Sequence, residues 1–168
     1  MPKAIKLFVK YVDAFNFRIG RFAMYLLFVM MAILLWSSFS KTFFNPSLWT
    51  LEMAQFTLTA YYLLGGPYSM QMDEHVRMDL FYGSWTPETK AWVDAFTIFF
   101  LIFFLSVLLY GAYESTSYSL QYGERSATAW RPYKWPIKII MFSGILLMLL
   151  QSVSVFFKDV AKIRGEEL

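Results

Sequence analysis

Hydrophobic and polar positions along the chain fall into long blocks rather than short alternations. Four apolar runs lie at about residues 22–39, 49–70, 90–112 and 136–157, and short polar stretches separate them. A helix needs about 20 residues to cross roughly 30 Å of hydrocarbon, and each run with its flanks is long enough. The pattern therefore predicts an all-α integral membrane protein with four transmembrane helices, and we treat residues 1–168 as a single membrane domain.

Residues 2–18 have the pattern of an amphipathic helix. Their apolar side chains recur every three or four residues on one face, and their lysines lie on another. The apolar positions are Ile5, Phe8, Val9, Val12 and Phe15, and the lysines are Lys3, Lys6 and Lys10. Two interpretations are equally open. The helix can lie in the membrane interface with its lysines toward lipid phosphates, or it can extend the first span toward the cytoplasm.

Helix boundaries can be predicted from turn and capping residues. Thr86-Pro87-Glu88 is a typical helix start, and no stop follows it before Gly123. The third helix is therefore expected to overshoot the bilayer and to project residues 114–122 beyond it. Gly65-Gly66-Pro67 should bend or thin the last turns of the second span, and its glycines should let another helix approach closely.

Composition narrows the possible functions. Charged residues make up 16% of the chain, against roughly 25% in soluble domains, and apolar residues make up 58%. The absence of cysteine excludes disulfides, zinc–thiolate sites and iron–sulfur clusters, and a single histidine excludes a histidine-rich metal site within this chain. Basic residues flank the apolar runs instead of gathering on one face, so nucleic acid is not an expected partner. No cofactor is expected.

The distribution of basic residues predicts the orientation. With the N-terminus inside and four spans, ten of the fifteen Lys and Arg residues fall on the cytoplasmic side. The positive-inside rule then places both termini of a multi-pass membrane protein in the cytoplasm. The outer side keeps the remaining five cations, which are Lys41, Arg125, Arg131, Lys134 and Lys138.

Glu52 is the first residue that could carry chemistry. An acidic side chain in a membrane segment suggests a proton or cation site by default. Glu52 lies in the first turns of its helix, however, where a carboxylate interacts favourably with the helix dipole. We therefore favour a structural anchor or a subunit contact, and Gln55, one turn further, has the same interpretation.

His75, Arg77 and Asp79 form the second candidate. Catalysis would need a nucleophile and a pocket, and neither is visible in the sequence, so an enzyme is not expected. A membrane haem usually needs two histidines, and the chain has one. An interfacial cluster in which Arg77 and Asp79 pair at the inner membrane edge is the favoured interpretation.

The segment from Trp49 to Tyr82 resembles a known family. Glu52, Gly65-Gly66 and the run Asp-Glu-His-Val-Arg-Met-Asp-Leu at residues 73–80, together with four spans, resemble the small DctQ-type membrane subunit of tripartite ATP-independent periplasmic (TRAP) transporters. Met53-Ala54-Gln55 stands where that family more usually has a basic residue.

The resemblance implies an accessory scaffold in a sodium-coupled importer of an organic acid. Its partners would be a large membrane subunit, a periplasmic substrate-binding protein and membrane lipid. The residues agree, because no internal repeat and no mid-membrane cluster of polar groups is apparent. Spans three and four, or the second span at Gly65-Gly66, are expected to pack on the large subunit. Arg125, Arg131 and Lys134 are expected to help dock the binding protein.

Two rival functions remain open. One is an autonomous four-span transporter that works as a dimer around Glu52. The other is a membrane anchor subunit of a redox complex.

Overall fold

The structure is a computed structural model that describes residues 3–72 and 86–164. Four helices make up nearly all of the described chain. They are α1 (Lys3–Phe43), α2 (Thr50–Gln71), α4 (Pro87–Tyr122) and α5 (Trp135–Arg164). Each covers one of the four predicted spans, so the prediction of an all-helical protein is confirmed.

The segment predicted to be amphipathic does not form a separate helix. Residues 3–18 continue without a break into the first span as part of α1, which is 41 residues long. At 1.5 Å per residue this helix is about 60 Å long, about twice the thickness of the hydrocarbon core. Part of its apolar face packs inside the protein: Val9 is buried, and the ring of Phe8 meets Phe157 of α5 at 6.4 Å. Phe15 remains exposed.

The predicted boundaries of α4 are confirmed. The hydroxyl of Thr86 accepts a hydrogen bond from the backbone N–H of Thr89, and Gly123 ends the helix in the left-handed conformation with φ of 59°. In α2, the helix continues through Gly65, Gly66 and Pro67 to Gln71. The glycine–proline triplet therefore does not end this helix.

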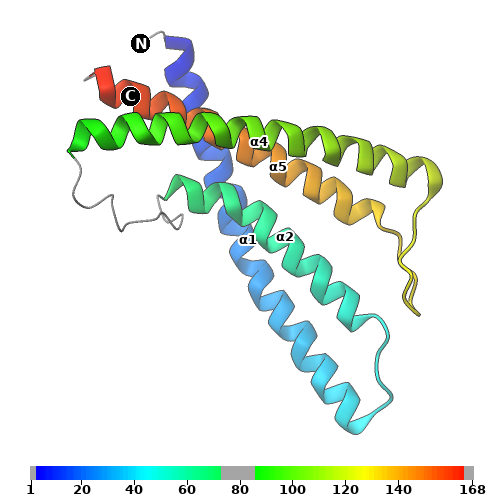
Figure 1. Cartoon of the computed structure of the whole chain (residues 1–168). Coiled ribbons are helices and arrows are strands. Elements are labelled where there is room, and N and C mark those ends of the chain that lie inside the picture. The colour runs from blue at the N-terminus through cyan, green and yellow to red at the C-terminus, as the bar shows by residue number, and fades with distance from the viewer. Residues whose placement is uncertain (1–2, 73–85, 165–168) are drawn as a thin grey trace.

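The helices form two hairpins that meet at one end (Figure 1). α1 pairs with α2, and α4 pairs with α5; α5 also packs on α2 and α1, so it joins the two hairpins. Both described ends of the chain lie where the hairpins meet, and we call this the inner end (Figure 1). The hairpins diverge toward the opposite, outer end, where residues 44–49 and 123–134 connect the helices.

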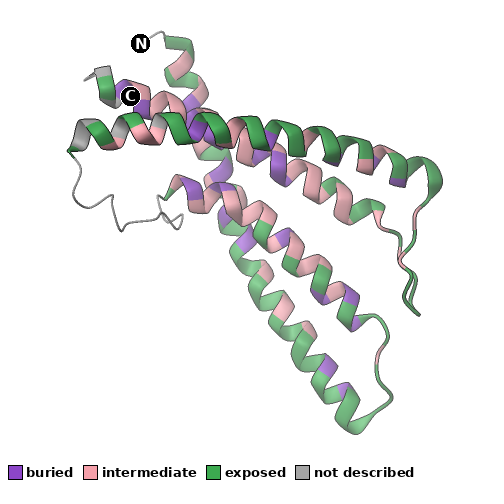
Figure 2. Ribbon diagram, viewed as in Figure 1, coloured by how far each residue is buried: buried purple, intermediate pink, exposed green. Residues whose placement is uncertain are grey.

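Little of the apolar surface is buried (Figure 2). The main core lies between α4 and α5, around Leu105, Ala112 and Ile145, and Leu63 of α2 reaches it. The outward faces of α1 and α4 are apolar and exposed; on α4 they include Phe96, Phe99, Phe103 and Phe104. A surface of this kind suits lipid or a protein partner rather than water.

Three helices, α1, α4 and α5, are long and apolar enough to cross a membrane among the described residues. α2 is 22 residues long, about 33 Å, but it carries Glu52, Gln55 and several threonines. The second predicted span, which lies on α2, stays a prediction.

Candidate functional site

Glu52 lies at the outer end, where a loop from the other hairpin reaches α2. The residue is only 4% exposed, although it stands in the first turn of its helix. Thr128, in the connection between α4 and α5, donates its hydroxyl hydrogen to Oε1 of Glu52. The other oxygen, Oε2, is buried with no hydrogen-bond partner among the described residues. The carboxylate thus ties the second hairpin to the first.

The connection between α1 and α2 is held by hydroxyl groups next to this carboxylate. Thr50 donates to Ser37 Oγ at 3.1 Å and accepts from Ser47 Oγ at 3.1 Å. Ser40 donates to the carbonyl of Asn45 at 2.9 Å. Since both Thr50 and Glu52 are buried in the first turn of α2, the outer end of this helix is fixed on two sides.

Residues 123–134, which we call the outer loop, fold back on themselves. Backbone hydrogen bonds join Ser126 to Pro132 at 2.9 Å and Lys134 to Glu124 at 3.0 Å. The Arg125 guanidinium lies 4.2 Å from the centre of the Tyr133 ring and donates to the Tyr133 hydroxyl. The side chains of Arg125 and Tyr133 thus bind each other within the loop.

Glu124 binds two lysines at the base of the outer loop. Its carboxylate lies 2.5 Å from Nζ of Lys138 and 3.0 Å from Nζ of Lys134. These hydrogen bonds lower the pKa of Glu124 from 4.5 to about 2, and the bond from Lys138 has the larger effect. The predicted docking cation Lys134 therefore has an internal partner.

Arg131 is the third predicted docking residue. It lies near the tip of the loop, is exposed, and adopts a left-handed φ of 51°. Its backbone N–H donates to the carbonyl of Thr128 at 3.2 Å, which closes the turn. Trp130 beside it is also exposed.

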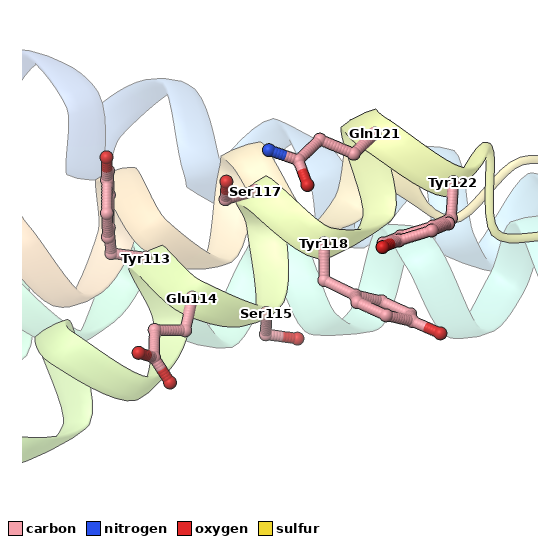
Figure 3. Close-up of a pocket in the computed structure, with 7 residues that line it drawn as sticks. All are labelled: Tyr113, Glu114, Ser115, Ser117, Tyr118, Gln121 and Tyr122. Atoms are coloured by element: carbon pink, nitrogen blue, oxygen red, sulfur yellow. The ribbon is translucent and has the colours of Figure 1, made fainter.

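The last turns of α4 carry an exposed tyrosine-rich surface, which we call the tyrosine face (Figure 3). The ring centres of Tyr118 and Tyr122 lie 4.6 Å apart. Glu114, one turn before Tyr118, accepts a hydrogen bond at 2.8 Å from the hydroxyl of Tyr110. The surface forms an open depression of about 580 Å³. It is lined by Tyr113, Glu114, Ser115, Ser117, Tyr118, Gln121 and Tyr122.

A second group of polar residues lies near the inner end, between α1 and α5. Asn16 donates to Gln151 at 2.7 Å, and Gln151 donates to Asp13 at 3.0 Å. Ser154 also donates to Asp13, at 3.1 Å, and Lys158 forms an ion pair with it at 2.5 Å. We call Asp13, Asn16, Gln151, Ser154 and Lys158 the inner polar cluster.

The inner polar cluster was not predicted from the sequence. It lies near the inner end of the bundle, and the expectation that no cluster of polar groups lies at mid-membrane stays a prediction. Gln151 and Ser154 belong to the predicted span 136–157, and both are fully buried. The available signal was the run Gln151-Ser-Val-Ser inside an otherwise apolar helix, since polar residues in a membrane helix need partners. The bonds of the cluster join helices of this chain to each other.

Close helix approach occurs at glycines other than the predicted pair. A Cβ atom on Gly20 would lie 2.2 Å from Cβ of Tyr68, and one on Gly144 would lie 2.8 Å from Cβ of Leu63. Gly66 faces Met148 at an ordinary 3.6 Å, while Gly65 has open space around it. Gly20 and Gly144 thus permit the α1–α2 and α2–α5 contacts.

The remaining predicted site residues are Gln55, His75, Arg77 and Asp79. The side chain of Gln55 is exposed, one turn away from the buried Glu52. His75, Arg77 and Asp79 lie outside the described residues. The partner of Glu52 was missed, because Thr128 is 76 residues away in sequence and belongs to a loop with no distinctive motif.

Comparison with known protein families identifies the family of the chain. The sequence pattern of the family described as "Tripartite ATP-independent periplasmic transporters, DctQ component" matches residues 19–162, which is most of the chain. The match covers α2 and α4 completely and most of α1 and α5. No curated protein matches the sequence. The family is a component of a transporter and not a family of enzymes. The chain belongs to the DctQ family, the small membrane component of the tripartite ATP-independent periplasmic transporters.

Proposed function

We propose that this chain is the accessory scaffold subunit of a sodium-coupled TRAP transporter in the bacterial inner membrane. The transporter would import an organic acid that a periplasmic binding protein delivers. The large membrane subunit would carry the substrate and the sodium ions, and this chain would brace it. Both termini would lie in the cytoplasm, which puts the inner end of the bundle there and the outer loop in the periplasm.

One observation carries this proposal. The polar side chains buried in the described part of the chain bond mainly to other groups of the same chain, at its two ends. A transport pathway would instead need polar groups that remain available to a solute near the middle of the bilayer. Many large apolar side chains face outward, which suits packing against lipid and a larger protein.

The aromatic face of α4 is the surface that best suits the large subunit. Phe99, Phe103 and Phe104 are more than half exposed, and α4 packs chiefly on α5. Aromatic side chains supply much of the contact energy at protein interfaces, because each ring covers a large apolar area.

The binding protein would dock at the outer loop and the adjoining tyrosine face. Tyrosine and arginine are enriched at protein interfaces, and here Tyr118, Tyr122 and Arg131 are exposed at the same end of the protein. Of the cations first considered, Arg125 and Lys134 have partners inside the loop, so Arg131 is the one best able to meet a carboxylate of a partner.

Affinity purification from native membranes tests the scaffold role. A tagged chain should retain a much larger membrane protein through mild detergent, and mass spectrometry should identify it as the transporter's large subunit. Serine substitutions at Phe99 and Phe103 should reduce its recovery. Recovery of the chain alone under every mild condition would contradict the proposal.

A charge reversal in the outer loop tests the docking of the binding protein. Arg131→Glu should weaken binding of the periplasmic protein to the reconstituted complex by about tenfold, as a central interface arginine would. Lys41→Glu is the matched control, since Lys41 is an exposed cation at the outer end of α1. Equal losses in both variants would indicate a general effect of charge and would remove Arg131 from the docking surface.

A further inference from the structure

The first half of α1 exposes a row of cations whose function the scaffold role does not explain. Lys10, Arg18 and Arg21 are all exposed. Lys10 and Arg21 are eleven residues apart, about three helical turns, so they lie on the same side of the helix. Arg18 is one turn before Arg21, and the two guanidinium groups can therefore reach one ligand.

No acidic side chain of α1 offsets this charge at the surface. Asp13 is the one acid of α1, and it turns into the inner polar cluster, where Lys158 pairs with it at 2.5 Å. The Arg21 guanidinium lies 4.9 Å from the centre of the Phe17 ring. A contact with a ring face leaves the N–H groups of an arginine free to bind an anion.

The surface next to the two arginines is apolar. Going outward along α1, Phe22, Tyr25 and Val29 are 61%, 63% and 47% exposed. Phe22 follows Arg18 by four residues and Tyr25 follows it by seven, so these side chains continue along the same side of the helix. A ligand that fits here needs an anionic end and a long apolar part, in that order along the helix.

We propose that Arg18 and Arg21 bind the phosphate of an acidic phospholipid in the leaflet at the inner end, with its acyl chains along Phe22, Tyr25 and Val29. Arg18 and Arg21 directly precede the predicted span 22–39, so they lie at headgroup level when that span fills the hydrocarbon. Lys10 adds long-range attraction to the anionic leaflet. The inference concerns the contacts of this chain alone and does not depend on the scaffold role.

Lipid titration of the purified full-length chain tests the site. In a neutral detergent, native mass spectrometry would follow binding of phosphatidylglycerol and of phosphatidylcholine with the same acyl chains. The parent chain should bind phosphatidylglycerol more tightly. Arg18→Gln/Arg21→Gln should weaken that binding about tenfold or more, because each cation near a lipid surface contributes about a fivefold effect. Arg18→Lys/Arg21→Lys should keep most of it.

Lys41→Gln/Arg131→Gln is the control for net charge. It removes two exposed cations at the outer end and should leave phosphatidylglycerol binding unchanged. Equal weakening in both double variants, or no preference for phosphatidylglycerol in the parent, would overturn the proposal. The thermal midpoint of each variant, measured in the same detergent, should match that of the parent.

Two further outcomes would assign the arginines to another ligand. Displacement of the lipid by millimolar inorganic phosphate would identify a site for the free anion. Loss of the large subunit on purification of Arg18→Gln/Arg21→Gln, with lipid preference unchanged, would identify a protein contact. Either result would overturn the lipid assignment.

Discussion

Thr128, in the loop between α4 and α5, donates a hydrogen bond to the buried carboxylate of Glu52 at the start of α2. This bond joins the two hairpins. The hairpins diverge at this end (Figure 1). At the opposite end the inner polar cluster joins α1 to α5. Polar contacts therefore connect the hairpins at both ends, while the middle of the bundle relies on apolar packing and close contacts at glycine.

Thr128→Val should destabilise the protein by about 1–3 kcal/mol, because it leaves both oxygens of the buried Glu52 carboxylate without a hydrogen bond. Thermal unfolding in detergent, followed by circular dichroism, would measure the loss. Thr97→Val is the matched control, since the Thr97 hydroxyl bonds only to the carbonyl one turn back, on an exposed face of α4. Equal stability of the two variants would show that Thr128 does not hold Glu52.

Asn16→Leu should also destabilise the protein by about 1–3 kcal/mol, since it removes the donor to the buried Gln151 side chain. Gln151→Leu should cost at least as much, because Gln151 bonds to both Asn16 and Asp13. The double variant should lose less than the sum of the single losses, as expected for residues in direct contact. Strict additivity in the unfolding free energies would contradict the cluster.

Alanine substitutions at glycine should separate close contacts from open positions. Gly144→Ala should cost about 1–3 kcal/mol, because the new Cβ would lie 2.9 Å from the backbone oxygen of Leu63, which cannot easily move. Gly65→Ala should be neutral or stabilise by up to about 1 kcal/mol, since it meets nothing within 4 Å and favours the helix. The reverse order of thermal midpoints would refute this packing.

The stability of the outer loop should depend on pH through Glu124. Its pKa falls from 4.5 to about 2 in the folded protein, because Lys138 and Lys134 bind the carboxylate. The stabilisation is therefore fully present above about pH 4.5 and is lost as the pH falls toward 2. The thermal midpoint of the parent should drop further over this range than that of Glu124→Gln. Parallel curves for the two proteins would argue against the ion pairs.

Single cysteines should report the orientation, because the natural chain contains none. In intact cells whose outer membrane is permeable to the reagent, a membrane-impermeant maleimide should label Arg131→Cys in the outer loop and spare Lys3→Cys. After the inner membrane is disrupted, both should react. Labelling of Lys3→Cys in intact cells would reverse the proposed topology.

The sequence predicted the helices well, because each one has a local signal. Thr86 and Gly123 are capping residues for α4, and both act as predicted. The long apolar runs were likewise local signals, and they located α1 and α5. The continuous α1 could not be distinguished from two helices. Gly20 weakens the helix between the two segments, and the contact of Phe8 with Phe157 depends on α5.

The contacts between helices were harder to predict. Glu52 was recognised as unusual because a buried acid is costly in a membrane helix, but the partner depends on how the second hairpin folds toward it. Gly20 and Gly144 resemble any glycine in an apolar helix, and only the approach of Tyr68 and Leu63 reveals their role. Asp13 was not recognised either, because its partner Lys158 lies near the other end of the chain and only the folded structure brings the two together.

Transport by reconstituted proteoliposomes tests the central claim most directly. One set would contain this chain alone, and the other would contain it with the co-purified large subunit; both would have an inward sodium gradient and the loaded binding protein outside. We predict that labelled substrate accumulates only in vesicles that contain both subunits. Sodium-driven accumulation by this chain alone would contradict the account, because the chain would then be a transporter in its own right.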